Sequence, residues 1–174
     1  MNKILKILLC LILIIIVGTV LVLIYPNFNK KYSLNEFNIT FKAPIHYEQI
    51  KSEEKNIAFK SNKNGIGIAI YKFEKNFLSP TDIVEKIDDY AGLLEAANYD
   101  CVLENTKSEI IEVSKKVCGK YTAEIKSLNQ LNKEKTIIIP MEEYDLIFSV
   151  YGVEDEMLKN EKQVEYILSS IKIK

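Results

Sequence analysis

The sequence contains no arginine and no tryptophan, and only one histidine among its 174 residues. Arginine grips phosphate and carboxylate groups with two parallel hydrogen bonds, so an anion site here would have to use lysine or backbone amides. The charges nearly cancel, with 23 basic residues, all lysine, against 24 acidic ones. The chain therefore lacks the basic field that recruits nucleic acid, and we expect no nucleic-acid partner.

Motifs that carry chemistry are also missing. A zinc site usually needs three or four ligands, and a catalytic triad needs a base held by a third group, which the single histidine, His46, does not visibly supply. No phosphate-binding glycine loop, no G-x-S-x-G motif and no calcium-loop pattern occurs. We interpret the carboxylate clusters as solvent-exposed faces and helix N-termini. They are Glu53–Glu54, Asp88–Asp89, Glu142–Glu143 and Glu154–Asp155–Glu156. We expect no catalytic, cofactor-binding or metal-binding residue, no cofactor, and a protein that is not an enzyme.

Cysteine is scarce, and only Cys101 and Cys118 lie outside an N-terminal apolar run. They flank two consecutive predicted strands, where their Cα atoms could approach within the roughly 4.4 to 6.8 Å that a disulfide requires. Cys118 is out of phase with Gly119 and Tyr121, however, so its side chain is expected on the opposite sheet face. The sequence leaves two alternatives open, a Cys101–Cys118 disulfide in an oxidising compartment or two unpaired, mostly buried thiols.

What the sequence does have is a long apolar run at its start. Residues Ile7 to Ile24 are apolar except for Thr19, and Tyr25 follows where amphipathic rings collect at the lipid boundary. A helix of about twenty apolar residues matches a hydrocarbon core of roughly 30 Å. We therefore predict one transmembrane helix with its ends at Ile7 and Tyr25, which makes the lipid bilayer a partner.

A cleaved secretory signal is the competing interpretation, because Lys3 and Lys6 form a basic start. The run exceeds the usual length of about 7 to 15 residues and no A-x-A pair follows it, which favours an uncleaved signal anchor. Lysines on both sides of the run leave the orientation undecided by charge. Because a short basic tail normally stays in the cytoplasm, we expect a single-pass cell-membrane protein with its domain outside. A cytosolic domain tethered by its N-terminus is the alternative.

The rest of the chain reads as a linker over residues 26–36 and one domain over 37–174, after an anchor at 1–25. Alternating apolar residues predict strands near 37–41, 57–59, 66–73, 101–113, 117–125, 133–139 and 143–151. The strand at 66–73 is apolar on both faces and is expected near the sheet centre. Ser79 and Pro80 predict the start of a helix over 80–97, and the acidic residues 154–156 open a final helix.

Strands in runs, interrupted by two helices, predict an α+β fold with an antiparallel sheet of about six to seven strands flanked by two helices. The tyrosines could furnish a binding surface. Most of them, however, stand at positions of the strand and helix patterns that face the core, which favours a role in core packing. They are Tyr71, Tyr90, Tyr99, Tyr121, Tyr144 and Tyr151.

Several segments together resemble the PsbP-like family, an α/β/α sandwich. The first two are the opening strand that ends in Ala43-Pro44-Ile45-His46-Tyr47 and the helix after Ser79-Pro80. The others are the strand Val117-Cys118-Gly119-Lys120-Tyr121 and the C-terminal segments Tyr144–Gly152 and Ile167–Ile171. Members include the extrinsic photosystem subunit, Ran-binding Mog proteins and membrane-anchored surface proteins of Gram-positive bacteria. Tyr47 stands where the family usually has tryptophan.

The resemblance implies an accessory role in protein complexes, since relatives mostly work by contact. We therefore expect a membrane-anchored, extracytoplasmic, non-catalytic binding or accessory protein of the cell envelope, with a protein partner that the sequence does not name. Two rivals remain, an envelope-acting enzyme with an unrecognised site and a pilin-like structural subunit. The pilin needs an acid near the start of its apolar helix, where this chain has Lys6.

Overall fold

The computed structural model describes residues 29–75, 78, 82–98, 100–127 and 129–174. The predicted membrane span, from Ile7 to Tyr25, lies outside these residues. Among the helices that the structure describes, none has the length and apolar character to cross a bilayer.

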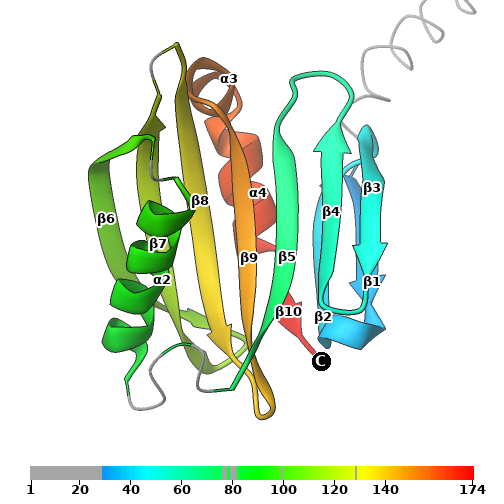
Figure 1. Cartoon of the computed structure of the whole chain (residues 1–174). Coiled ribbons are helices and arrows are strands. Elements are labelled where there is room, and N and C mark those ends of the chain that lie inside the picture. The colour runs from blue at the N-terminus through cyan, green and yellow to red at the C-terminus, as the bar shows by residue number, and fades with distance from the viewer. Residues whose placement is uncertain (1–28, 76–77, 79–81, 99, 128) are drawn as a thin grey trace, which may run out of the picture.

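The centre of the fold is a seven-stranded antiparallel sheet with the order β3-β4-β5-β9-β8-β7-β6 (Figure 1). The strands are β3 (Tyr47–Glu53), β4 (Asn56–Ser61), β5 (Gly67–Glu74), β6 (Val102–Val113), β7 (Lys116–Lys126), β8 (Leu131–Pro140) and β9 (Tyr144–Val153). The predicted α+β class is confirmed, and so is the prediction of about six to seven strands in the antiparallel sheet. The apolar 66–73 segment becomes β5, an interior strand paired with β4 and β9.

A second sheet corrects the predicted linker at 26–36. From Asn29 onward this segment is part of the fold, because β1 (Asn29–Leu34) pairs with β2 (Ile39–Pro44), which in turn pairs with β10 (Lys172–Ile173). A short 3-10 helix, η2 (Asn35–Phe37), joins β1 to β2. The polar sequence of β1 hid this strand, since it contacts the core mainly through Tyr32 and Leu34 while its backbone bonds to β2.

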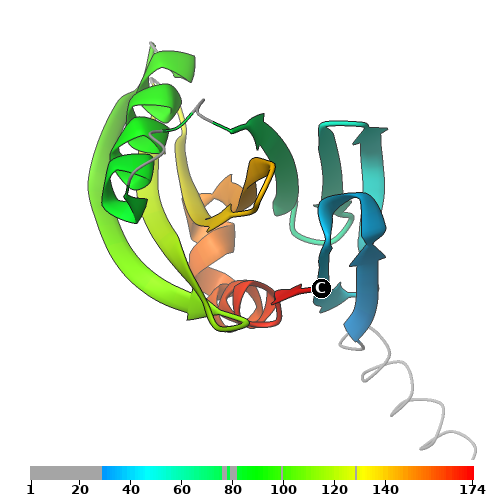
Figure 2. The same cartoon turned by 90° about the horizontal axis from the view of Figure 1, so that it is seen from below.

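Helices lie on both faces of the large sheet (Figure 2). On one face, α2 (Ile83–Ala97) packs on β6, β7 and β8. The other face is covered by α3 (Glu154–Lys159), α4 (Glu161–Ser169) and the small sheet. The β5 side of the first face carries no described helix.

Two hydrophobic cores follow from this layering. The larger core fills the space between the large sheet and the layer formed by α4 and the small sheet. It contains Phe41, whose ring contacts the rings of Phe59 and Phe148 edge-to-face. The smaller one lies under α2 around Ile87 and Tyr121. As expected from strand phase, Cys118 points into the larger core, on the side of the sheet away from Tyr121.

Helix α2 approaches β7 closely because β7 has a glycine at the contact. A Cβ atom on Gly119 would lie 2.5 Å from Cγ1 of Ile87, closer than real Cβ contacts come. A larger residue at position 119 would force the Ile87 side chain, or the helix that carries it, to move. The glycine therefore permits the close packing of α2 on β7.

The structure corrects both helix predictions in detail. Asp82 caps α2, since its side chain accepts a hydrogen bond from Val84 N at 3.3 Å, whereas Ser79 and Pro80 lie outside the described residues. The single final helix is two helices, because Asn160 leaves helical geometry between α3 and α4. The amide of Asn160 donates to the carbonyl of Glu156 at 2.8 Å, which satisfies the end of α3.

Strand β6 contains a bulge between Glu104 and Lys107. The pairing of β6 with β7 shifts between Glu104 and Lys107, and Asn105 adopts a left-handed backbone conformation with a φ of 48°. Asparagine tolerates this conformation, and the Asn105 amide donates to Glu124. Strand β6 therefore continues through the irregularity as one strand.

Candidate binding groove

A groove of about 410 Å³ lies beside α2, on the part of the sheet that the helix leaves uncovered. Its wall is the side of α2 that carries Leu93, Leu94 and Ala97. Its floor comes from β5, β9 and β8, three strands that are neighbours in space although β5 is far from the others in sequence.

The floor is ordered by the sheet register. Gly67, Tyr151 and Glu134 form one row across β5, β9 and β8, because Tyr151 is the register partner of both others. The next row on the same face contains Ala69, Ser149 and Thr136. Neighbouring strands lie roughly 4.8 Å apart, so side chains within a row are in mutual reach.

Two tyrosine rings form the exposed part of the floor. Tyr71 and Tyr151 are 42% and 38% exposed, so they are surface residues rather than the core packers that their strand phase suggested. Tyr151 leans over its row partner, since a Cβ on Gly67 would lie 2.5 Å from the Tyr151 ring. The glycine thus provides the space that the ring occupies.

Below the rings lies a cluster of hydroxyl groups around one carboxylate. The hydroxyl of Tyr90, on α2, donates to Oε1 of Glu134 at 2.6 Å, and the hydroxyl of Thr136 donates to the same oxygen at 2.8 Å. Thr136 and Ser149 share a further hydrogen bond at 2.7 Å. Tyr90, Thr136 and Ser149 are buried. The hydroxyls of Tyr90 and Thr136 therefore fix the position of Glu134, and Ser149 bonds to both of them.

Glu134 raises the proton affinity of the surrounding phenols. The pKa of Tyr90 is raised by burial first and by the neighbouring Glu134 charge second. Burial and the same carboxylate also raise the pKa of Tyr71, and for Tyr151 the nearby Tyr71 adds to these causes. The groove is therefore a region of negative potential lined by neutral phenols.

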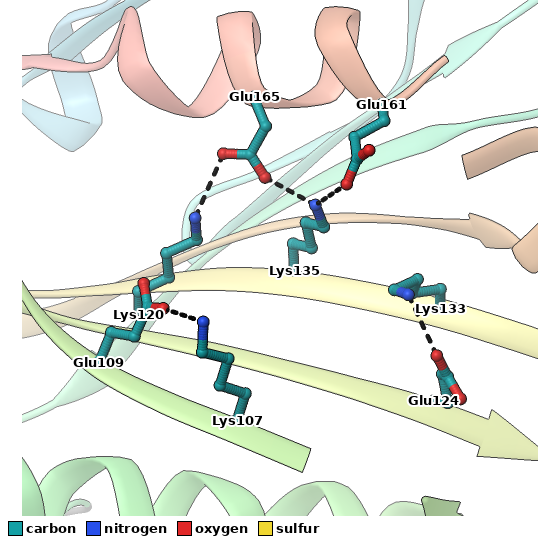
Figure 3. A network of polar contacts seen from close by, with 8 residues as sticks. All are labelled: Lys107, Glu109, Lys120, Glu124, Lys133, Lys135, Glu161 and Glu165. Atoms are coloured by element: carbon teal, nitrogen blue, oxygen red, sulfur yellow. Dashed lines mark hydrogen bonds and ion pairs between the residues drawn. The ribbon is translucent and has the colours of Figure 1, made fainter. Parts of the chain in front are cut away.

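The opposite face of β8 is arranged differently (Figure 3). There Lys133 pairs with Glu124 at 3.0 Å, and Lys135 pairs with Glu165 at 2.6 Å and with Glu161 at 3.3 Å. The sequence Lys133-Glu134-Lys135 alternates between faces, so both lysines meet carboxylates while Glu134 meets hydroxyls only. Among the described residues no lysine pairs with Glu134.

A larger hollow of about 600 Å³ lies between α4 and the ends of β6 and β7. Ile111, Val113 and Leu168 line it together with Lys120 and Glu165. These two charged residues bind each other at 3.2 Å, so each charge in this pair is already compensated before a ligand arrives. Glu112 and Lys172 also line this hollow, so its lining carries charges of both signs. The groove beside α2 has a mainly aromatic and aliphatic lining around one carboxylate, and we take it as the candidate site.

His46 lies in a turn. Its Nδ1 is 3.0 Å from Oγ of Ser61, and its ring stacks on Tyr47. That Ser61 oxygen also accepts hydrogen bonds from the backbone amides of Lys63 and Asn64, so it holds the turn after β4. Burial, together with the charge of Lys63, lowers the pKa of His46. No carboxylate among the described residues bonds to the histidine, and the arrangement is that of a turn rather than a triad.

The carboxylate clusters belong to separate elements, although Glu54 and Glu143 line one shared hollow together with Lys55 and Lys72. Residues 53–54 stand at the β3–β4 turn, 88–89 on α2, 142–143 at the β8–β9 turn and 154–156 at the start of α3. Within the described ranges no three His, Cys, Asp or Glu side chains come together in a way that could hold a metal ion.

Of the two alternatives for Cys101 and Cys118, the structure contains the free thiols and not the disulfide. Cys101 precedes β6, whose first residue pairs with Lys126, whereas Cys118 pairs with Ile111 toward the other end of the same hairpin. At about 3.3 Å per residue these positions are on the order of 30 Å apart. The disulfide alternative fails because the two cysteines lie toward opposite ends of this antiparallel hairpin.

Sequence reasoning missed the groove because its residues meet only in the tertiary fold. Tyr71 and Tyr151 belong to strands that pair across more than half of the domain. Glu134 was the one residue whose position in the sequence indicated a site. It is an acidic residue on the same face of β8 as Thr136 and Ile138. Tyr99 lies outside the described residues.

Comparison with solved structures finds this architecture at low sequence identity. Cyanobacterial PsbP (CyanoP) from Synechocystis sp. PCC 6803 matches with a TM-score of 0.60 at 12% identity, over 84% of this chain and 92% of that chain. LpqN, described as involved in cell envelope biogenesis of Mycobacterium tuberculosis, matches with a TM-score of 0.50 at 12% identity, over 78% and 82%. A Bacteroides thetaiotaomicron protein matches with 0.54 at 11% identity, over 83% of this chain and 48% of its own.

Neither a family model nor a curated protein sequence matches the chain. The likeness to solved structures covers most of the described residues and includes the family that the sequence resembles. The expectation is confirmed at the level of the fold, and this chain has a PsbP-like fold.

Proposed function

We propose that this protein is a single-pass, membrane-anchored, non-catalytic accessory module of the cell envelope, whose domain lies outside and binds a protein partner through the groove beside α2. The observation that carries the proposal is the groove itself, in which two exposed tyrosines lie against an apolar helix wall. Exposed aromatic side chains of this kind are enriched where proteins bind one another.

The envelope location draws support from two sources. The apolar run from Ile7 to Tyr25 has the length of a membrane span. LpqN, a structural neighbour, is described as acting in cell envelope biogenesis. Tyr25 precedes β1 by only four residues, a stretch that reaches about 14 Å at most, so the domain would work close to the membrane.

The non-catalytic role draws support from the placement of the reactive groups. The His46–Ser61 pair holds a turn, and Cys118 is buried in the larger core. Glu134 is bound by hydroxyl groups and has no histidine, lysine or thiol bonded to it among the described residues. A groove with one carboxylate suits recognition better than acid–base chemistry, which requires a second convergent group.

Site-specific photo-crosslinking in intact cells tests the proposal. A photoreactive amino acid replaces Leu93 on the groove wall in one variant and Leu158 in another. Leu158 lies on α3, away from the groove, and is 49% exposed. The proposal expects one crosslinked protein of defined mass from position 93 and none from 158. Equal crosslinking from both positions, or none from 93, contradicts it.

Added protease tests the orientation separately. Trypsin applied to intact cells is expected to remove the domain, because many exposed lysines offer cleavage sites in it. Full protection while the membrane is intact, followed by digestion after lysis, would place the domain in the cytosol.

A further inference from the structure

We infer that the groove takes a cationic side chain of the partner protein, with its charged end at Glu134 and its alkyl stem against the rings of Tyr71 and Tyr151. This inference rests on the proposed function, since it names the chemistry by which the same groove selects its partner. Three features of the groove carry it.

The first feature is an uncompensated charge. Glu134 is the single charged residue that lines the groove, although the chain has 23 lysines. The groups that face it are hydroxyl, aromatic or aliphatic: Tyr90 and Leu94 from α2, Tyr71 from β5, Ser149 and Tyr151 from β9. A cation in the groove would gain a partner, and Glu134 would gain a counter-charge that no described residue supplies.

The second feature is the way Glu134 is held. Both hydroxyl donors, Tyr90 and Thr136, bind Oε1, whereas no described residue bonds to Oε2. The carboxylate is therefore oriented before any ligand arrives and keeps one oxygen available. A charged hydrogen bond to a prepositioned carboxylate costs little further ordering of the protein side.

The third feature is the match between the lining and a long cationic side chain. Tyr71, Tyr151 and Phe73 offer ring surfaces, and Leu93 and Leu94 offer aliphatic surface. Methylene groups pack on such surfaces, and an ammonium or guanidinium group is attracted to aromatic faces. The negative potential of the groove disfavours an acidic ligand, and the lone carboxylate gives a purely apolar ligand no benefit.

The test is a paired titration of the full-length chain in detergent micelles, with isotope-labelled leucine and alanine methyl groups. N-acetyl-lysine methylamide is the probe, and N-acetyl-norleucine methylamide has the same stem without the charge. We expect the lysine probe to shift the methyl signals of Leu93, Leu94, Ala69 and Ala97. Its affinity is expected to be about tenfold higher than that of the norleucine probe.

The variant Glu134→Gln is expected to remove most of the difference between the two probes while it keeps an oxygen that accepts from Tyr90 and Thr136. Glu161→Gln removes one charge from the opposite side of β8 and is expected to leave the tenfold difference unchanged. If the Glu134→Gln substitution impairs folding, added salt provides the second readout. The affinity of the wild-type chain for the lysine probe is then expected to fall as the ionic strength rises. Its affinity for the norleucine probe is expected to stay the same.

Equal affinities for the two probes, or methyl shifts away from the groove, would overturn the inference. Failure of the inference can be told from failure of the proposed function. If crosslinking from position 93 persists in the Glu134→Gln variant, the groove binds a partner without using this charge, and the inference is wrong. If position 93 gives no crosslink while the lysine probe still binds, the cation site stands and the proposed partner does not.

Discussion

The hydroxyl of Tyr90 on α2 donates a hydrogen bond of 2.6 Å to Glu134 on β8 and so joins the helix to the floor of the groove. Tyr90 is 8% exposed, and its ring also contacts Tyr121 edge-to-face. The bond serves two purposes at once, because it attaches α2 to the sheet and orients the carboxylate on which recognition is proposed to depend.

The variant Tyr90→Phe isolates this hydrogen bond. It keeps the ring and removes the donor, and a hydrogen bond to a charged group contributes about 2 kcal/mol. We expect the free energy of unfolding to fall by about this amount in a urea titration. Tyr166→Phe is the control, since Tyr166 is 38% exposed and no bond of its hydroxyl is found among the described residues. Equal stability of the two variants would contradict the role of Tyr90.

A buried ion pair attaches α2 to β9 as well. Nζ of Lys86 lies 2.6 Å from Oδ2 of Asp145, with side chains 5% and 0% exposed. Removing one partner leaves a buried charge, so Lys86→Met is expected to cost about 3 to 5 kcal/mol.

The double variant Lys86→Met with Asp145→Leu is expected to cost less than the sum of the single substitutions, because the double substitution leaves no charge behind. Urea unfolding of all three variants measures this coupling. The exposed pair Lys55–Glu74, at 2.7 Å, is the control, and Lys55→Met is expected to give no resolvable change. Additive costs at Lys86 and Asp145 would contradict the account.

The parts of the fold that can be predicted from sequence are those where one strand face is consistently apolar. The strands β5 and β9 are recognisable because Ile68, Ile70, Leu146 and Phe148 alternate into the larger core. The strands β1 and β3 escape prediction for the opposite reason. Strand β3 is an edge strand whose residues after Tyr47 are all exposed, so backbone pairing with β4 defines it and hydropathy does not.

The groove is beyond prediction for a different physical reason. Its rows depend on the register between β5 and β9, which places Gly67 opposite Tyr151, and on the docking of α2 at Gly119. Both are set by tertiary packing rather than by local periodicity. The alternation that identifies the strands does not reveal which tyrosines a helix will cover.

The pH dependence of stability tests the charged side of β8. Burial raises the pKa of Glu165, but hydrogen bonds from Lys135 and Lys120 outweigh it and hold that pKa below its ordinary value. A carboxyl with a lowered folded pKa adds stability above its unfolded pKa, and this contribution is lost as the pH falls through the folded pKa. The stability difference between wild type and Glu165→Gln is therefore expected to be larger at about pH 7 than at about pH 3.5.

Urea titrations at both pH values measure this difference. Glu54→Gln, which alters an exposed carboxylate in the β3–β4 turn, is the control and is expected to track the wild type at each pH. A stability difference for Glu165→Gln that grows as the pH falls would contradict a lowered pKa for this carboxyl in the folded protein.

The two cysteines of the domain are expected to differ in reactivity. Burial raises the pKa of Cys118 to about 11, and the thiolate is the reactive form. Cys101 is partly exposed at the start of β6. Under native conditions iodoacetamide is expected to modify Cys101, and Cys118 is expected to react only after unfolding. Peptide mapping without reduction measures both, and a peptide pair linked through these residues would contradict the free thiols.

The most direct measurement of the central claim is hydroxyl-radical footprinting of the full chain in its native membrane and after purification. Tyr71 and Tyr151 in the groove are 42% and 38% exposed, and Tyr166 on α4 is 38% exposed, which makes it a matched reference. If the groove binds a partner, Tyr71 and Tyr151 are expected to be protected in the membrane and labelled after purification, while Tyr166 is labelled equally in both. Equal labelling of all three tyrosines in both preparations would contradict the account.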